Sequence, residues 1–294
     1  MSTFWSWFVA VISLGMIFAC YWLIKWTTKR RSGEAAEGDV TGHTWDGNLE
    51  QYNNPLPNWW LWLFYITIVF ALIYLVLYPG LGNFKGVLNW SSTGQYQQEM
   101  QRADQEYGPI FAAYAETDIP QLAEQDEAMA AGRRLFLTYC ATCHGSDACG
   151  ARGFPSLKDD DWLWGGHPQA IKTSILNGRT GVMPSQAHLG EEKIDDVTAY
   201  VLSLSGRDAA TGDVEAGRQI FQQNCAVCHG PDAKGQIAMG APNLTDNTWL
   251  YGGSPGIIRQ TLREGRQGKM PAHEAFLGED KVHLLAAYVY SLSD

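Results

Sequence analysis

The sequence predicts an all-α fold in which two N-terminal transmembrane helices are followed by two small tandem helical domains. Two long apolar runs near the N-terminus contain no charged residue, and the second half of the chain is an internal duplication. Within the duplicated segments, apolar residues recur at helical spacing and no alternating strand pattern competes. A chain of 294 residues has room for two such domains.

The first apolar run extends from Phe4 to Ile24 and predicts a transmembrane helix within residues 1–26. A helix of roughly 20 residues spans the hydrocarbon layer of a bilayer. A cleaved signal peptide would instead need a basic start, a shorter apolar core and a small-residue cleavage site. The chain begins Met-Ser-Thr and aromatic residues follow the run, which favours a retained span.

The second apolar run, Trp59 to Tyr78, predicts a transmembrane helix over residues 58–79 that ends at Pro79. Tryptophans at its start and tyrosines near its end are typical of the two membrane interfaces. Four basic residues follow the first run, so the positive-inside rule places the loop 27–57 in the cytoplasm. A buried hairpin in a soluble protein is the alternative, and two uncharged runs of this length disfavour it. Both termini are therefore expected outside.

Residues 80–127 are predicted to be a polar connector outside the membrane. Residues 95–107 are expected to form an exposed helix that ends near Pro109. We interpret this segment as a tether along the membrane surface.

The motif Cys-x-x-Cys-His occurs once in each duplicated segment, as Cys140, Cys143 and His144 and again as Cys225, Cys228 and His229. It is the attachment signature of c-type haem. Two thiols bond to the two vinyl groups, and the adjacent histidine binds the iron from one face. A zinc site would need more nearby ligands, and a thioredoxin-like redox motif does not need the histidine. Two copies favour two covalently bound haem c groups.

The repeats, residues 128–207 and 208–294, are predicted to be tandem class I cytochrome c domains. Each has a helix before the haem motif, a middle helix that begins with proline, and a closing helix that begins at Glu191 or Glu279. The first two helices are expected at 133–139 and 168–176 in one repeat, and at 214–223 and 255–263 in the other. The core of each domain is expected to be largely the cofactor.

A methionine follows each haem motif in the context Gly-Arg-x-Gly-x-Met-Pro, at Met183 and Met270. A lone methionine usually packs in a core. The repeated context instead predicts that both thioethers are the second axial ligands of the iron, a coordination that raises the reduction potential and closes the iron to substrate. The sequence leaves open whether each methionine serves the haem of its own repeat or that of the other. Met239 has no counterpart and is expected to pack.

Other residues are assigned weaker roles. Pro155 and Pro242 follow the haem motifs and are expected to shape the pocket, each with a backbone carbonyl available to the proximal histidine. Four aromatic residues are expected to pack against haem or to hydrogen-bond to it: Trp162, Trp164, Trp249 and Tyr251. Four histidines are expected to be solvated or satisfied: His167, His188, His273 and His283. Cys20 is expected to pack, and Cys149 to be a loop thiol.

The formal net charge of −10 argues against a nucleic-acid partner, which would require a basic surface. An acidic surface can steer a basic partner during encounter. Solubility alone is an equally good explanation of this charge.

The chain resembles the di-haem P subunit (CcoP/FixP type) of cbb3-type cytochrome c oxidases along nearly its full length. The specific part of the resemblance precedes the haem motifs. It comprises Trp45-Asp46-Gly47, Asn54-Pro55-Leu56-Pro57-Asn58-Trp59-Trp60, Tyr78-Pro79-Gly80 and Gly82-Asn83-Phe84-Lys85-Gly86. Many members of this family have a single span, so the first helix departs from the family pattern. The predicted topology remains consistent with the extra helix.

The resemblance implies an electron-transfer subunit that is not an enzyme by itself. Electrons would come from a soluble or membrane cytochrome c and pass through the two haems. They would continue towards a mono-haem cytochrome subunit and the catalytic subunit of a haem-copper oxidase. The location implied is the bacterial inner membrane, in contact with lipid, with the haem domains in the periplasm. The cysteines, histidines and methionines named above match the attachment positions and axial ligands of the family.

Two alternatives remain at this stage. A stand-alone membrane-anchored di-haem shuttle fits the repeat equally well, although a simple tether needs only one span. A di-haem peroxidase would need one iron that is or becomes five-coordinate, and two equivalent Met-Pro segments argue against it. The sequence does not indicate which haem receives electrons first, which donor is used, or what the extra span does.

Overall fold

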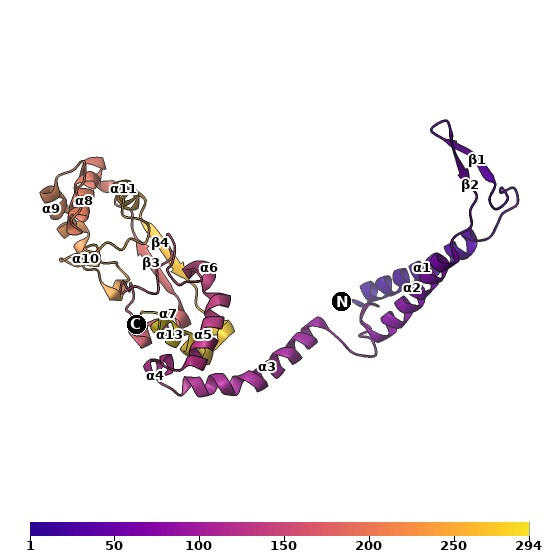
Figure 1. The fold of residues 1–294 in the computed structure, drawn as a ribbon, viewed down its shortest axis with the longest axis horizontal. Coiled ribbons are helices and arrows are strands. Elements are labelled where there is room, and N and C mark those ends of the chain that lie inside the picture. The colour runs from indigo at the N-terminus through magenta and orange to yellow at the C-terminus, as the bar shows by residue number, and fades with distance from the viewer. Residues whose placement is uncertain (294) are drawn as a thin grey trace. The chain divides into compact units, whose positions relative to one another are not determined.

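The computed structural model describes residues 1–293 and is mostly helical (Figure 1). It divides into two compact units, of which the first ends at Asp104 and the second begins at Gln105. The long helix α3 (Ser92–Ala115) contains this boundary.

Two long apolar helices, α1 (Thr3–Thr27) and α2 (Asn58–Leu77), dominate the first unit. Their mean hydropathies are 2.2 and 2.4, and almost none of their side chains is buried. A helix that exposes this much apolar surface needs an apolar solvent, which a bilayer provides. The predicted spans are thus confirmed as helices of suitable length and composition.

The start of α1 is hydrogen-bonded to the segment that follows α2. The Asn83 amide N–H donates to Ser6 Oγ at 2.8 Å, and Asn83 Nδ2 donates to the Met1 carbonyl at 3.2 Å. A Cβ atom on Gly82 would lie 2.6 Å from the Cα of Ser6. Glycine there allows the close approach of the two segments, so the extra first helix is joined to the stretch that carries the family resemblance.

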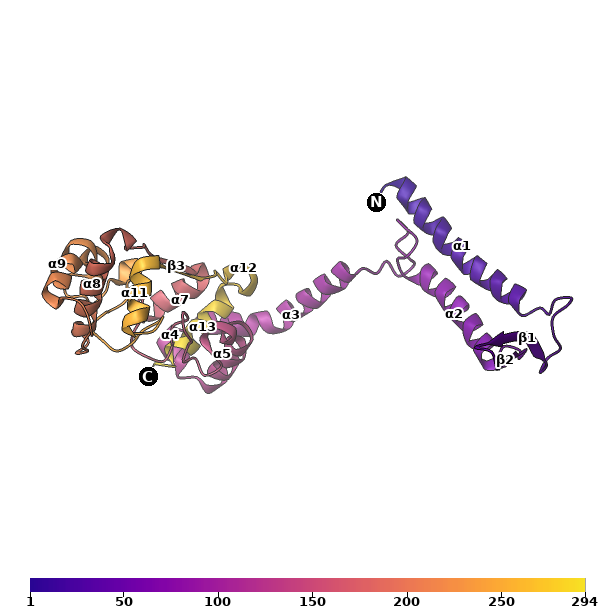
Figure 2. The same cartoon turned by 90° about the horizontal axis from the view of Figure 1, so that it is seen from above.

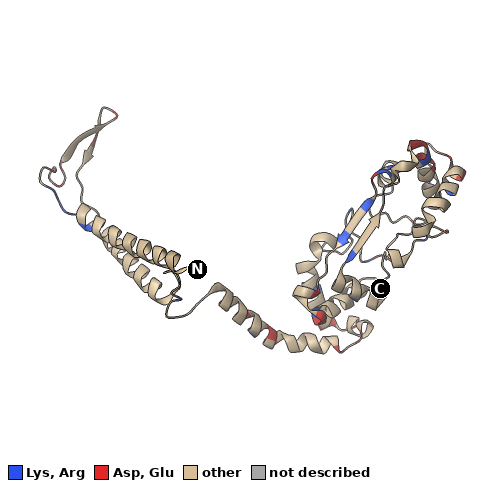
Figure 3. Ribbon diagram, turned by 180° about the vertical axis from the view of Figure 1, so that it is seen from behind, with Lys and Arg blue, Asp and Glu red and all other residues tan. Residues whose placement is uncertain are grey.

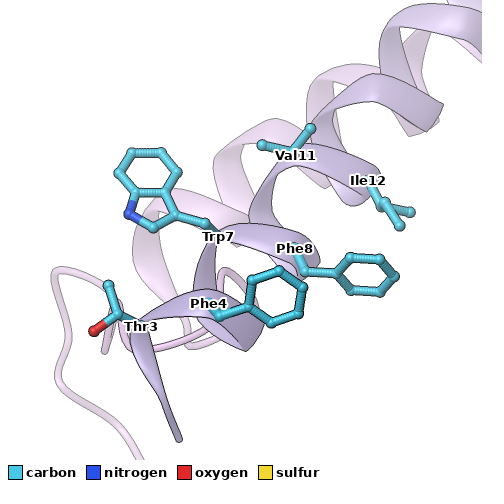
Figure 4. Close-up of a pocket in the computed structure, with 6 residues that line it drawn as sticks. All are labelled: Thr3, Phe4, Trp7, Phe8, Val11 and Ile12. Atoms are coloured by element: carbon cyan, nitrogen blue, oxygen red, sulfur yellow. The ribbon is translucent and has the colours of Figure 1, made fainter.

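Figure 4 shows a shallow apolar notch on the surface of α1, lined by side chains of its first three turns. Phe4, Trp7, Phe8 and Val11 line it. The notch belongs to the lipid-facing surface of a candidate spanning helix, and we assign no ligand to it.

The loop between α1 and α2 contains a hairpin that sequence analysis did not predict. Strands β1 (Val40–Trp45) and β2 (Leu49–Tyr52) pair antiparallel. Asp46, Gly47 and Asn48 connect them, and the first two have positive φ (51° and 83°). Three-residue hairpin loops commonly contain such a positive-φ position, which aspartate and glycine tolerate better than most residues. The prediction of a purely α-helical fold is wrong at this point.

Helix α3 is longer than predicted and continues through Pro109 to Ala115. A proline inside a helix removes one backbone hydrogen bond and costs about 3 kcal/mol. Beyond the proline, Phe111 and Tyr114 pack against the core of the second unit. This burial offsets the cost of the proline, so the helix does not end where local propensity alone predicts.

The second unit consists of two lobes, each with its own apolar core (Figure 2). The first lobe contains α4 (Ile119–Ala123), α5 (Asp126–Tyr139), α6 (Ala141–His144), α7 (Pro168–Asn177), α12 (Glu274–Leu277) and α13 (Glu279–Tyr290). The second lobe contains η1 (Ala187–Leu189), α8 (Glu191–Leu204), α9 (Val214–Asn224), α10 (Ala226–His229), η2 (Ile237–Met239) and α11 (Pro255–Glu264). Every helix predicted in the repeats is confirmed, although α5 begins several residues earlier than expected.

The two lobes do not correspond to the two sequence repeats, because the closing helices are exchanged. Helix α13 closes the second repeat but packs on α5 and α7 of the first. Helix α8 closes the first repeat but packs on α9 and α11 of the second. Leu284 and Leu285 of α13 are fully buried beside Phe136, and Leu202 of α8 is fully buried in the core that contains Phe221.

Two short strands carry the chain from one lobe to the other. β3 (Arg179–Met183) and β4 (Arg266–Met270) pair antiparallel, with Arg179 opposite Met270 and Met183 opposite Arg266. Sequence analysis predicted no strand here. A segment that crosses between lobes must be extended, and the antiparallel partner satisfies its backbone groups.

Three ion pairs bridge the exchanged helices to their new partners: Lys172 with Glu279 at 2.8 Å, Arg259 with Asp195, and Arg263 with Glu191. One member of the Lys172–Glu279 pair and both members of the Arg263–Glu191 pair are exposed to solvent, and exposed pairs contribute roughly 0–1 kcal/mol. The apolar contacts of α8 and α13 therefore determine the exchange.

Candidate haem sites

Each Cys-x-x-Cys-His motif sits at a sharp break between two helices. α5 ends at Tyr139 and α6 begins at Ala141, with Cys140 between them; α9 and α10 repeat this geometry around Cys225. The break turns the first cysteine toward the core of its lobe. Burial raises the pKa of Cys140 and of Cys225 to about 11, so both are neutral thiols. A structural zinc site needs four converging ligands, and no three His, Cys, Asp or Glu side chains of residues 1–293 converge on one point.

The histidines of the two Cys-x-x-Cys-His motifs are buried, and each holds one defined tautomer. His144 Nδ1 donates to the Pro155 carbonyl at 2.9 Å, and His229 Nδ1 donates to the Pro242 carbonyl at 3.1 Å. The predicted role of these proline carbonyls is confirmed. Desolvation lowers the pKa of both histidines. Each imidazole is therefore neutral near pH 7, and its Nε2 lone pair is available to a metal.

The exchange of closing segments places each methionine in the lobe of the other repeat. Met270 packs against the core that contains Cys140 and Ala141. Met183 packs against the core that contains Cys225 and Ala226. The structure thus brings together Cys140, Cys143, His144 and Met270 in the first lobe, and Cys225, Cys228, His229 and Met183 in the second.

Two glycines permit this crossing. A Cβ atom on Gly178 would lie 2.4 Å from the Met270 carbonyl oxygen, and one on Gly265 would lie 2.5 Å from the Met183 carbonyl oxygen. Both glycines have positive φ (69° and 73°). The glycine that precedes each strand is therefore required by the close passage of the other repeat's methionine segment.

Aromatic side chains and arginines line the side of each lobe next to the strands. Trp162 packs in the first core and Trp249 in the second. The Arg179 guanidinium lies 4.9 Å from the centroid of the Trp164 ring, and that of Arg266 lies 4.7 Å from the centroid of the Tyr251 ring. Sequence analysis assigned roles to the aromatic residues but none to the arginines, although each lies in the repeated Gly-Arg-x-Gly-x-Met-Pro motif.

The second lobe fits a cofactor that carries hydrogen-bond acceptors. Trp249 Nε1 and Arg266 Nη2 are buried donors without a hydrogen-bond partner within residues 1–293. Unpartnered buried donors are rare in proteins and point to a missing acceptor. A haem has an apolar macrocycle and two carboxylates, so it matches the thiols, the neutral histidine, the aromatic rings and these donors together.

The remaining histidines lie outside the ligand sets. His167 is exposed and accepts a hydrogen bond from the Ala170 N–H at 3.2 Å, which caps α7 as expected, and His188 is exposed. His283 Nε2 donates to the Thr117 carbonyl at 2.8 Å. His273 departs from the prediction, because it is buried with its ring centroid 5.4 Å from that of Phe276 and its Nδ1 has no partner within residues 1–293. His283 is satisfied only at Nε2, because its buried Nδ1 also has no partner among these residues.

Carboxylates from both repeats approach each other near these sites. Desolvation raises the pKa of Asp246, and the neighbouring Asp161 and Asp159 raise it further. The pKa of Asp147 is lowered instead, because its carboxylate accepts hydrogen bonds from Cys149.

We expect Asp246→Asn to raise the melting temperature slightly at pH 7. Because the pKa of Asp246 is raised in the folded protein, folding disfavours its charged carboxylate. This penalty is fully present at neutral pH and is lost as the pH falls below the unfolded-state pKa near 3.8. The side-chain amide oxygen of this variant would still accept from the Thr248 N–H, as the carboxylate does. Asp147→Asn is the control of opposite sign and should lower the melting temperature at pH 7. Thermal denaturation at pH 7 and pH 3.5 measures both effects; a gain from Asp246→Asn that persisted at pH 3.5 would contradict the electrostatic origin.

Models of two protein families match the chain. The N-terminal domain of cytochrome oxidase-cbb3, FixP, matches residues 37–85. Cytochrome C oxidase, cbb3-type, subunit III matches residues 127–201 and 212–289, so one model fits each repeat.

Curated relatives match almost the whole chain. A cbb3-type cytochrome c oxidase subunit CcoP of Rubrivivax gelatinosus is 44% identical, over 98% of this chain and 95% of that protein. A subunit FixP of Bradyrhizobium sp. (strain ORS 278) is 41% identical, over 86% of this chain and 94% of that protein. A subunit CcoP of Cereibacter sphaeroides is 38% identical, over 90% and 97%.

Proposed function

The chain belongs to the CcoP/FixP family of cbb3-type cytochrome c oxidase subunits, and we propose that it carries two covalent haem c groups with exchanged methionine ligands. As a member of this family it is a membrane-anchored electron-transfer subunit. The observation that supports the ligand assignment is that Met270 packs against the same apolar core as Cys140, and Met183 against the same apolar core as Cys225.

Cys140 and Cys143 would attach haem 1, and His144 and Met270 would hold its iron. Cys225 and Cys228 would attach haem 2, and His229 and Met183 would hold its iron. When bound, each haem supplies one-electron redox chemistry at potentials that axial ligands and burial adjust. The carbonyls of Pro155 and Pro242 orient the histidines. The two thioethers would be the second protein ligands of the irons and would exclude substrate from them.

The membrane part of the chain holds these sites at the bilayer. By the positive-inside rule, Lys25, Lys29, Arg30 and Arg31 support a cytoplasmic loop after α1, with both termini and both haem sites in the periplasm. A donor cytochrome c, soluble or membrane-bound, reduces the haems. Electrons then pass to a mono-haem cytochrome subunit and the oxygen-reducing subunit of the same complex, in the inner membrane of a bacterium.

A di-haem peroxidase is the competing function from another class. It would need one iron without a sixth protein ligand. Met183 and Met270 occupy equivalent places in the two lobes, which favours two electron-transfer sites. Rapid peroxide turnover by the isolated protein would contradict this assignment.

Detergent extraction of the full-length chain tests the proposal. We expect two haems per polypeptide by pyridine haemochrome assay, and co-purification with a haem-copper subunit. Replacing Cys140 and Cys143 by serine should leave one covalent haem, because the thioether bonds to that haem can no longer form. A colourless wild-type chain, or zinc bound at the cysteines, would overturn the proposal; haem without a co-purifying oxidase would favour the stand-alone shuttle.

A further inference from the structure

Helix α3 carries a row of apolar side chains that the other residues of 1–293 leave exposed. The row consists of Tyr96, Met100, Ala103, Tyr107 and Ile110, which follow one another at alternating steps of four and three residues. Side chains at this spacing lie on one face of a helix. The four large side chains of the row are 48–61% exposed. Apolar residues scattered singly on a surface are ordinary, whereas a contiguous exposed patch marks an interaction site.

The row has the register of a helix that packs against one other helix. Alternating steps of four and three residues define the a and d positions of the heptad abcdefg, whose side chains form the seam between two packed helices. Met100 and Tyr107 occupy a positions, and the other three residues occupy d positions. The next a position is Tyr114, which packs against the core of the second unit. The same face of α3 is therefore covered at its C-terminal end and exposed along the preceding turns.

The positions that flank this seam are acidic or neutral. Gln97 and Asp104 occupy e positions, and Glu99 and Glu106 occupy g positions. None of the three carboxylates forms an ion pair with another residue of the described chain. Arg102, the one basic residue in the sequence of α3, occupies position c on the opposite side of the helix. Figure 3 shows the acidic positions on α3. A helix that docked on the seam would meet carboxylates on both sides and no cation.

This charge pattern argues against two possible occupants of the seam. In a parallel pair of two α3 helices, Glu99 of one copy would face Asp104 of the other, and in an antiparallel pair it would face Glu106. Like charges at such positions destabilise a helix pair, so a second copy of this chain is disfavoured. Helices that bind a membrane surface carry Lys and Arg beside the apolar face, so an anionic bilayer is disfavoured as well.

We propose that α3 docks one helix of another subunit of the oxidase, and that Lys or Arg residues flank the apolar seam of that helix. The inference rests on the proposed function, since it requires the chain to be part of a complex. Apolar side chains of the partner helix would cover the row, and its cations would pair with Glu99, Asp104 and Glu106. Docking at this place would attach the connector, as well as the membrane spans, to the complex.

Site-specific photo-crosslinking in the membrane-bound complex tests the docking face. We place p-benzoylphenylalanine at Tyr96 or Tyr107 in the full-length chain, and at Gln98 or Gln105 as the matched control at f positions on the opposite face. We expect the first two proteins to crosslink to a co-purifying oxidase subunit and the controls not to do so. Peptide mapping should place the crosslink in a helix with Lys or Arg beside an apolar seam. Crosslinks to a second copy, to lipid alone or to a segment without basic residues would overturn the proposal, as would equal crosslinking from both faces.

Charge reversal tests the electrostatic part of the proposal. Glu99→Lys/Glu106→Lys in the crosslinkable chain should lower the crosslinking yield by about tenfold, because cations would then face cations. Gln98→Lys/Gln105→Lys adds the same two lysines on the opposite face and should leave the yield unchanged. Two covalent haems in each variant show that the haem lobes have folded.

The failure of the docking proposal is distinguishable from the failure of the proposed function. A wild-type chain that carries two haems and co-purifies with the oxidase, but gives no seam-specific crosslink, would overturn the docking of α3 alone. A wild-type chain without haem, or without a co-purifying haem-copper subunit, would instead contradict the proposed function.

Discussion

Met270→Ala should remove the sixth ligand from the haem attached to Cys140 and Cys143, although that methionine lies in the other repeat. Met270 packs in the first lobe and Met183 in the second. Loss of the thioether leaves the iron five-coordinate or bound to water, and lowers its reduction potential because methionine ligation raises it. The expected change is complete loss of the methionine-to-iron(III) charge-transfer band from one haem.

Single-haem backgrounds give this experiment a clear answer. In a Cys225→Ser/Cys228→Ser protein only haem 1 is attached, so Met270→Ala should abolish the charge-transfer band and Met183→Ala should preserve it. The Cys140→Ser/Cys143→Ser background should give the opposite result and acts as the matched control. If Met183→Ala abolished the band of haem 1, each repeat would ligate its own iron and the exchanged assignment would be wrong.

Leu285→Ala is expected to destabilise the lobe around His144, and Leu202→Ala the lobe around His229. Both leucines are 0% exposed. Leu285 belongs to the second repeat but lies in the core of the first lobe, and Leu202 belongs to the first repeat but lies in the core of the second lobe. A buried leucine replaced by alanine costs about 2–5 kcal/mol, through lost apolar contact and the cavity left behind. The penalty should fall on the lobe that contains the leucine.

Hydrogen exchange by mass spectrometry separates the two effects. Leu285→Ala should accelerate exchange in α5, and Leu202→Ala in α9, because local opening follows the local loss of stability. Each variant is the other's control, since the same chemical group is removed. Faster exchange in α9 for Leu285→Ala, with α5 unaffected, would show that the closing helices are not exchanged in solution.

Local patterns in the sequence were sufficient to predict which residues form each candidate haem site. Cys140, Cys143 and His144 are defined by spacing alone, because the two vinyl groups and the iron fix the distances between ligands. Pro155 and Pro242 were also predicted correctly as carbonyl partners, since they recur at a constant place after each motif. Helix positions followed from apolar periodicity, which is a local property.

The hairpin β1–β2 and the passage of α3 through Pro109 show where local patterns fail. The polar loop gave no clear alternation, and the strands depend on a tight Asp46-Gly47 turn. In α3, Phe111 and Tyr114 gain contacts with residues far along the chain, which outweigh the unfavourable proline. Tertiary contacts of this kind are not visible in a short window of sequence.

The sequence by itself determined that the chain has two apolar spans, two haem motifs and two candidate methionine ligands. Only the tertiary structure decided which methionine lies in the same lobe as which motif. The repeats are so alike that α8 and α13 present similar apolar faces, and either closing helix has the pattern to cover either core. The antiparallel pairing of β3 with β4 resolves this ambiguity. Each strand runs into the lobe of the other repeat, so the closing helix that follows the strand packs in that lobe.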